Sequence, residues 1–148
     1  MKNINDAPKI SRQLLDVVEQ FNHYDKQSRS FGTDHELFIA EIHLIALIAE
    51  SENSCISELA KAIQVTKGAV SQMVKKLVKK GYLIKLVDSC NKTRILVLLT
   101  EKGWKAYEGH LEYHKKLDRK VFDVLQKYNG QERSAIYRFL SEMQGQWK

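Results

Sequence analysis

Cysteine is scarce in this chain of 148 residues, and its scarcity excludes two classes of small protein. The two cysteines, Cys55 and Cys90, are too few for a disulfide framework and too far apart for a Cys-x-x-Cys metal or redox motif. We therefore expect both to be reduced, unpaired thiols.

Long apolar runs are also missing. No stretch approaches the roughly 18 residues that a membrane-spanning helix needs, and the N-terminal region is polar and periodic rather than signal-like. With 43% hydrophobic and 28% charged residues and a single proline, the composition predicts one domain over residues 1–148. We expect a cytoplasmic protein with no membrane partner.

Acidic residues are almost absent from the segment 61–100. It holds nine basic residues and one acid, Asp88, so it carries a charge of +8, whereas the whole chain carries +6. A solvated face normally mixes charge signs, so neutralising phosphates best explains this block. An anionic membrane surface is the alternative, but no large apolar face accompanies these lysines. The segment therefore predicts nucleic acid as a partner.

Apolar residues recur at helical spacing over most of the chain, which predicts a mainly α protein. The expected helices cover residues 9–29, 36–50, 57–63 and 66–80, with a break around Gly32 and a helix end at Gly81. Residues 82–87 and 94–99 read as two strands of a β-hairpin around a polar tip. A long helix from 100 to about 128 and a last helix after Asn129-Gly130 complete the predicted order.

A short helix, a tight turn, a longer basic helix and a basic hairpin form a winged helix-turn-helix. An α-helix fits the roughly 12 Å wide major groove, where small or polar side chains near its N-terminus reach base edges. Here Thr66 is expected to cap the helix, Gln72 to read an adenine, and Lys67 or Lys75 a guanine. A lysine-rich solvated helix in another all-α domain is the alternative, and the succession of elements disfavours it.

Other basic residues of this segment are expected to contact the DNA backbone. Lys76, Lys79 and Lys80 fit phosphate contacts, which position a protein without specifying sequence. Lys92 and Arg94 in the hairpin are expected over the neighbouring minor groove or backbone. The candidate DNA-binding residues are Thr66, Lys67, Gly68, Ser71, Gln72, Lys75, Lys76, Lys79, Lys92 and Arg94.

The chain resembles the MarR family of bacterial regulators in the run SELAKAIQVTKGAVSQMVKKLVKKGYLIK, followed by RILVLLTEKG. The order of elements is similar along almost the whole chain. The resemblance implies a transcriptional regulator, expected to be a repressor, that binds double-stranded DNA at a palindromic operator. It also implies a DNA-binding lobe over residues 36–100 and a helical dimerisation lobe formed by residues 1–35 and 101–148.

Two positions depart from the family's pattern. Gln64 stands in the turn where many relatives carry glycine, which is tolerable if Gln64 is not left-handed. The wing tip reads DSCNKTR, whereas Asp-x-Arg-Arg is commoner in the family. The family's wing arginine therefore maps onto Thr93, with Lys92 and Arg94 beside it as substitutes.

The resemblance extends to the zinc-responsive branch of the family. His110 and His114 are four residues apart on a predicted helix, hence on one face and able to share a metal ion. Matched residue by residue, the branch's ligands fall on Asp25, His43, His110 and His114, which makes Zn²⁺ a candidate regulatory or structural cofactor. Partly exposed, hydrogen-bonded histidines are the alternative explanation of this pair. The branch's auxiliary site is not retained, since its cysteine falls near Phe31 and one of its glutamates on Gly109.

Two other sensors and one enzyme class are alternatives. A regulator of the same class that senses a small aromatic acid or phenol in an apolar cleft between the lobes is the runner-up. Redox sensing through Cys55 or Cys90 is disfavoured, because neither lies near the start of the first helix, where peroxide-sensing relatives carry their cysteine. A metal-dependent enzyme is disfavoured, because a zinc peptidase needs its glutamate directly after the first histidine and Glu112 is two residues after His110.

Apolar stripes at both ends of the chain predict a homodimer. Burying them between two subunits is the natural solution for a small chain, and it supplies the two-fold symmetry that a palindrome needs. The stripes are Ile10, Leu14, Val18 and Phe21 in the first helix and Ile136, Leu140, Met143 and Trp147 in the last.

Overall fold

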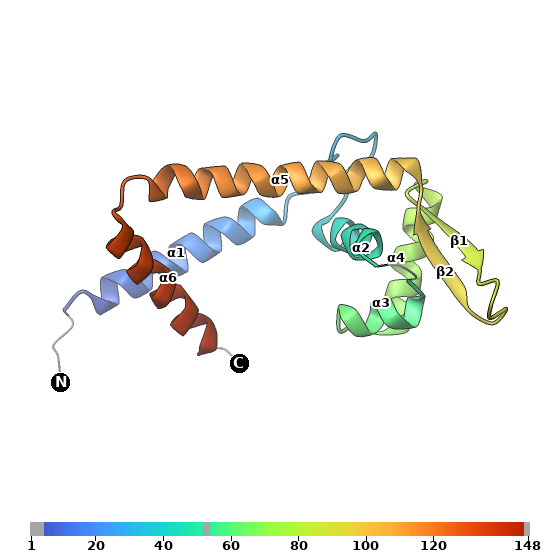
Figure 1. Ribbon diagram of the computed structural model, residues 1–148, viewed down its shortest axis with the longest axis horizontal. Helices are drawn as coiled ribbons and strands as arrows, with labels where there is room; N and C mark the ends of the chain where they lie inside the picture. Colours follow the sequence, from blue (N-terminus) through green and yellow to red (C-terminus); the bar gives the residue numbers. More distant parts are fainter. Residues whose placement is uncertain (1–4, 52–53, 147–148) are drawn as a thin grey trace. The chain divides into compact units, whose positions relative to one another are not determined.

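The structure is a computed structural model that describes residues 5–51 and 54–146; Trp147 of the predicted stripe lies outside them. The described residues form a mainly α chain with one antiparallel hairpin (Figure 1), which confirms the predicted fold class. The helices are α1 Ala7–Asp25, α2 Ile39–Ala49, α3 Ile56–Ala62, α4 Lys67–Lys79, α5 Glu101–Leu125 and α6 Gly130–Gly145. The strands are β1 Leu83–Val87 and β2 Ile95–Leu99. None of the described helices is long and apolar enough to cross a membrane.

The chain divides into two compact units, Met1–His110 and Leu111–Lys148. The division falls inside α5, one residue after His110. The first unit contains α1 to α4, the hairpin and the first part of α5, so every residue predicted to touch DNA belongs to it.

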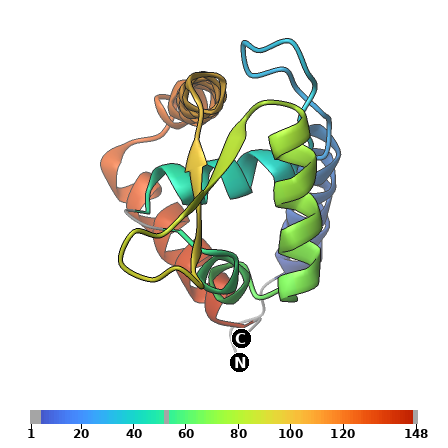
Figure 2. The ribbon, with the colours of Figure 1, turned by 90° about the vertical axis from the view of Figure 1, so that its right-hand side faces the viewer.

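The core of the first unit lies among α2, α3, α4 and the hairpin. Figure 2 shows α4 (light green) beside the hairpin (yellow), and the two are in contact through β1. On α4 the fully buried residues Val70, Val74 and Leu77 lie on one helical face, as the sequence pattern predicts. In the hairpin, Leu83 of β1 pairs with Leu99 of β2; Leu83 and Val97 are buried in the core, whereas the rest of β1 is exposed.

The segment between α1 and α2 is longer than the sequence pattern predicts. We expected helices over 9–29 and 36–50, but α1 ends at Asp25 and α2 begins at Ile39. Arg29 and Leu37 exchange two backbone hydrogen bonds (3.0 and 2.9 Å) in an antiparallel bridge. Residues paired in this way are extended, so neither helix includes them. Arg29 also donates side-chain hydrogen bonds to the carbonyls of Tyr24, Asp25 and Gln27, so it caps α1 from outside the helix.

Gln64, in the turn between α3 and α4, has φ +55° and is left-handed. The condition under which glutamine is tolerated here without strain, a residue outside the left-handed region, is therefore not met. Gly81, which follows α4, has φ +81°, and its predicted role as the left-handed residue after that helix is confirmed.

Candidate nucleic-acid interface

One face of α4 is exposed over its whole length. Its N-cap is Thr66, as predicted, and the Thr66 hydroxyl oxygen accepts a hydrogen bond from the Ala69 amide at 3.2 Å. Val70, Val74 and Leu77 turn to the core, and Met73 and Val78 pack against its edge, so the opposite face of the helix points away from it. The predicted contact residues on this exposed face are Lys67, Gly68, Gln72, Lys75 and Lys79, with Ser71 half-buried at its edge.

The basic residues of α4 fall into two groups by their ion pairs. Within residues 5–51 and 54–146, Lys67, Lys75 and Lys79 make no ion pair. Lys76, in contrast, lies 2.9 Å from the carboxylate of Glu41, and Lys80 lies 3.2 Å from the same oxygen. The first group therefore leaves three ammonium groups available to a polyanion.

Glu41 is the buried carboxylate that forms ion pairs with Lys76 and Lys80. It is 4% exposed and lies in the first turn of α2, where its side chain accepts a hydrogen bond from the Phe38 amide at 2.9 Å. Burial raises the pKa of this carboxyl, but the hydrogen bonds from Lys76, the Phe38 amide and Lys80 outweigh burial and hold the pKa below its usual value. Glu41 thus stays ionised and ties α2 to the last turns of α4. Phe38, the residue before α2, is 55% exposed.

The wing tip between β1 and β2 is a folded turn. The Asp88 carboxylate accepts from the Cys90 amide at 2.8 Å, and the Asn91 side-chain oxygen accepts from the amide and the hydroxyl of Thr93 at 3.1 and 2.7 Å. Thr93, onto which the family's wing arginine maps, is thus engaged within the tip. Lys92 is exposed there and makes no ion pair with any described residue.

Arg94, the other cation predicted for the wing, is turned toward α3. One of its terminal nitrogens donates to both carboxylate oxygens of Glu58, at 2.8 and 2.9 Å, and the other lies 3.7 Å from the Asp88 carboxylate. The hydrogen bond with Glu58 raises the pKa of the Arg94 guanidinium.

Two of the predicted metal ligands meet inside the first unit. The rings of His43 on α2 and His110 on α5 have centroids 5.4 Å apart at an interplanar angle of 60°. The His110 ring is 6% exposed and also meets the edge of Phe31 at 5.8 Å, whereas His43 is exposed. Two of the four predicted ligands, from helices far apart in the sequence, are therefore neighbours in the first unit.

Residues 40–117, more than half of the chain, match the family model described as a winged helix DNA-binding domain. This chain belongs to the winged helix family of DNA-binding domains. The matched residues include all of α3, α4 and the hairpin.

The fold is that of the MarR regulators, which confirms the predicted resemblance. ZitR of Lactococcus lactis, described as a zinc-responsive MarR family member, superposes with a TM-score of 0.77 at 20% identity, over 95% of this chain and 99% of ZitR. ZitR in complex with DNA has a TM-score of 0.76 at 22% identity, over 96% and 98% of the two chains.

Relatives found by sequence are described as transcriptional regulators. AdcR of Streptococcus pneumoniae is 31% identical over 106 residues, which are 72% of this chain and 72% of AdcR. The HTH-type regulator YhjH of Bacillus subtilis is 26% identical over 116 residues, 78% of this chain and 66% of YhjH. The chain thus spans just under two thirds of the length of YhjH.

The zinc site at Asp25, His43, His110 and His114 stays a prediction. Among the described residues, no group of three or more His, Cys, Asp and Glu side chains is arranged to hold a metal ion. Asp25 is the last residue of α1, and His114 follows His110 by one turn of α5, with its ring against Tyr113 at 5.6 Å. The donor types suit zinc, and the rings of His43 and His110 are neighbours.

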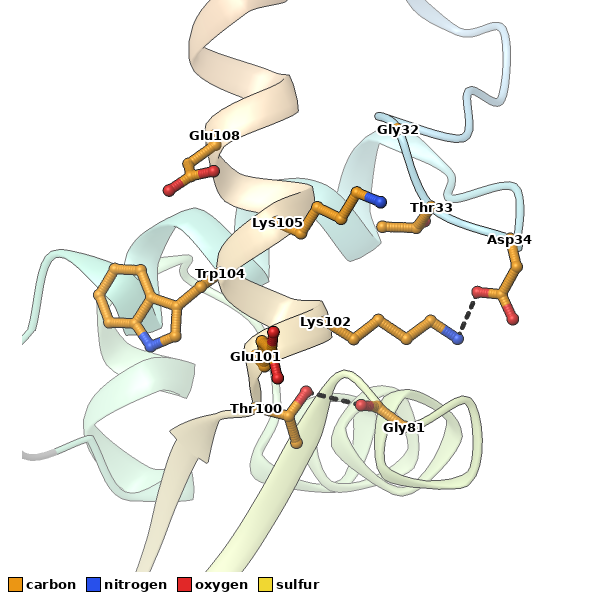
Figure 3. Close-up of a pocket in the computed structure, with 10 residues that line it drawn as sticks. All are labelled: Gly32, Thr33, Asp34, Gly81, Thr100, Glu101, Lys102, Trp104, Lys105 and Glu108. Atoms are coloured by element: carbon orange, nitrogen blue, oxygen red, sulfur yellow. Dashed lines mark hydrogen bonds and ion pairs between the residues drawn. The ribbon is translucent and has the colours of Figure 1, made fainter.

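A cavity of about 880 Å³ lies beside the start of α5 (Figure 3). Its lining includes Asp34, Lys102, Lys105 and Glu108, and Lys102 contacts Asp34 at 2.6 Å. Half of its ten lining residues are charged, so its lining suits a polar ligand better than an aromatic one.

Sequence reasoning missed two residues of this interface, Glu41 and Glu58. Each stands in the first turn of its helix and accepts a hydrogen bond from the backbone amide three residues earlier, which is a local signal that the sequence does carry. Their lysine and arginine partners lie 35 to 39 residues away in the chain, so no local pattern reveals the ion pairs.

Proposed function

We propose that this protein is a sequence-specific DNA-binding repressor that acts as a homodimer and inserts α4 into the major groove. One observation carries the proposal: the exposed face of α4 starts at a capped N-terminus and presents polar and unpaired basic side chains. The small residues Gly68 and Ser71 near that end let the helix approach base edges, and Gln72 follows them.

The assignment of contacts follows from exposure and charge. Gln72, Lys67 and Lys75 read bases, Lys79 contacts phosphate, and Lys92 reaches the backbone or minor groove from the wing tip. Lys76 is a weaker candidate, because its ammonium group is already neutralised by Glu41 in the free protein. Residues 36–100 form the DNA-binding lobe of this proposal, and residues 1–35 and 101–148 hold the dimer.

The test is a comparison of Gln72→Ala with Lys79→Ala on duplexes selected by the wild-type protein from a random DNA library. Gln72→Ala is expected to lose about 1–3 kcal/mol at particular base pairs and little on unselected DNA. Lys79→Ala is expected to weaken all duplexes alike and to lower the slope of log K against log[salt] by about 1. Wild-type behaviour of both variants would show that α4 is not the recognition helix.

We further propose that zinc binding at His43 and His110 regulates DNA affinity. Two findings support it: the 5.4 Å separation of the two rings, and the description of the structural relative ZitR as zinc-responsive. Asp25 and His114 remain the predicted additional ligands. Because α2 belongs to the DNA-binding lobe and α5 leads out of it, a shared metal ion favours one arrangement of these helices, and only such a preference changes DNA affinity.

Zinc titration against a chromophoric chelator separates this proposal from the DNA proposal. The wild type is expected to bind zinc, and the His43→Ala/His110→Ala variant to lose that zinc while retaining salt-sensitive DNA binding. His23→Ala, on the exposed surface of α1, is the matched control. Protons compete with zinc for imidazole nitrogen, so zinc affinity is expected to fall with falling pH. Equal zinc stoichiometry in the wild type and the double variant would refute the site.

A further inference from the structure

We propose that Arg94 is a positioning residue that clamps the wing to α3, and that Lys92 is the cation that the wing presents to DNA. This inference rests on the proposed DNA-binding function and changes the role expected for Arg94 from contact to support.

The geometry of the clamp favours a fixed partner. One terminal nitrogen of Arg94 donates to both oxygens of Glu58 at 2.8 and 2.9 Å, and the other lies 3.7 Å from the Asp88 carboxylate, so the guanidinium is held between two carboxylates. Glu58 is itself held, since one of its oxygens accepts from the Cys55 amide at 3.2 Å. The ion pair between Arg94 and Glu58 therefore joins the residue that precedes β2 to the first turn of α3.

The backbone places Arg94 at the base of the tip. Its carbonyl accepts from the Asp88 amide at 2.9 Å, and its own amide donates to the Asn91 carbonyl at 2.8 Å. These two bonds close the hairpin, so the Arg94 side chain starts beside β1 and α3 and not at the exposed tip where Lys92 lies.

Moving Arg94 to DNA would leave two carboxylates without their cation. The side chain of Asp88 is only 14% exposed, and Glu58 would remain at the same junction. Unpaired carboxylates beside a phosphate backbone repel it, and Arg94 cancels one of the two negative charges at this junction. The arginine therefore assists DNA binding by reducing this repulsion and by holding the wing against α3.

Salt titrations of DNA binding test the assignment, with the selected duplexes as the probe and Arg94→Gln, Glu58→Gln, their double variant and Lys92→Gln as the proteins. If the pair is a clamp, each single variant weakens binding roughly two- to fivefold and the double variant is no weaker than either. Arg94→Gln is expected to change the salt slope by clearly less than about 1, because Arg94 contacts no phosphate. Lys92→Gln is expected to lower the slope by about 1. A slope lowered by about 1 in Arg94→Gln, or tighter binding by Glu58→Gln, would overturn the clamp.

A second readout needs no DNA. Cys55 adjoins the clamp: burial raises the pKa of its thiol, the hydrogen bond with Ser57 and the proximity of Arg94 lower it, and the Glu58 side chain raises it. In a Cys90→Ser background, the pH dependence of alkylation by iodoacetamide reports this pKa. We expect Arg94→Gln to raise the pKa of Cys55 and Glu58→Gln to lower it; no change in either variant would overturn the clamp. If the wild type binds no DNA, the proposed function fails while this measurement still decides the clamp.

Discussion

Two residues that follow helices of the DNA-binding unit occupy the same backbone position with different side chains. After α3, the amides of Gln64 and Val65 donate to the carbonyls of Lys61 and Ala60 at 3.3 and 3.1 Å. After α4, Gly81 and Tyr82 repeat this pattern. Both ends are Schellman motifs, which need a left-handed residue; glycine adopts that conformation freely, whereas glutamine does so with strain.

Replacing Gln64 with glycine is therefore expected to stabilise the protein. A left-handed residue with a Cβ costs about 1–2 kcal/mol, and the greater unfolded-state freedom of glycine offsets part of the gain. We expect Gln64→Gly to raise the free energy of unfolding by about 0.5–1 kcal/mol in urea denaturation. Gly81→Gln, the reverse change at the matched position, is expected to lower it by about 1 kcal/mol. A loss of stability in Gln64→Gly would contradict this account of the turn.

The environment of Glu41 predicts how the stability of the protein depends on pH. Its pKa is held below the ordinary value of 4.5, so the folded state favours the ionised form. The stabilisation that ionised Glu41 provides is fully present above the pKa that this carboxyl has in the unfolded chain. It is lost as the pH falls through the lower pKa of the folded state.

We expect Glu41→Gln to lower the free energy of unfolding at neutral pH by about 1–2 kcal/mol, because Lys76 and Lys80 lose their carboxylate. The difference between wild type and variant is expected to shrink as the pH falls from about 5 toward 3, where the wild-type carboxyl becomes protonated. Chemical denaturation at a series of pH values measures it, with the exposed Glu142→Gln as control. A difference that is constant over this range would rule out the carboxylate as its source.

At the scale of elements, the segment between α1 and α2 is attached to α5 by a close backbone approach. A Cβ added at Gly109 would lie 2.3 Å from the carbonyl oxygen of Phe31, too close for any side chain. Phe31 is itself left-handed, at φ +47°, so its carbonyl cannot easily yield. The two positions onto which the auxiliary zinc site of the family maps are therefore in contact through backbone.

Gly109→Ala tests this contact. Alanine favours a helix over glycine by about 1 kcal/mol, but the overlap with Phe31 is expected to outweigh it and to leave a net loss of about 1–3 kcal/mol in thermal or urea unfolding. Gly68→Ala is the control, since its added Cβ would meet only the Thr66 hydroxyl at 3.9 Å and is expected to be neutral or stabilising. Equal stability of Gly109→Ala and wild type would mean that the segment moves aside.

At the scale of the whole molecule, two described helices bury none of their residues. α1 carries Phe21 and Val18 on its surface, and α6 carries Tyr137 and Leu140, all exposed. Apolar surface of this kind is typical of an interface between subunits, and a two-fold dimer would cover it in both copies at once.

Charges placed in these stripes are expected to dissociate the dimer. Light scattering of the wild type at micromolar concentration should give about twice the 17.2 kDa of one chain, whereas Phe21→Glu and Leu140→Glu should shift the mass toward one chain. Glu19→Gln, at an exposed polar position of α1, is the control. A wild type that scatters as a single chain would refute the homodimer.

The apolar periodicity of the sequence and its helix-capping residues were sufficient to predict most of the fold. The apolar spacing on α4, its cap at Thr66 and its end at Gly81 are local signals, and the +8 segment 61–100 pointed to a polyanion without any coordinates. These features depend on residues within one or two helical turns of one another, and so they are visible along the chain.

Tertiary structure alone decided which charges remain available and which histidines meet. Glu41 and Glu58 remove Lys76, Lys80 and Arg94 from the set of free cations, through ion pairs between residues more than thirty positions apart. The approach of His43 to His110 likewise requires the packing of α2 against α5. An ion pair or a shared ligand needs side chains within a few ångströms, and that distance is set by how helices pack, not by the spacing of residues along the chain.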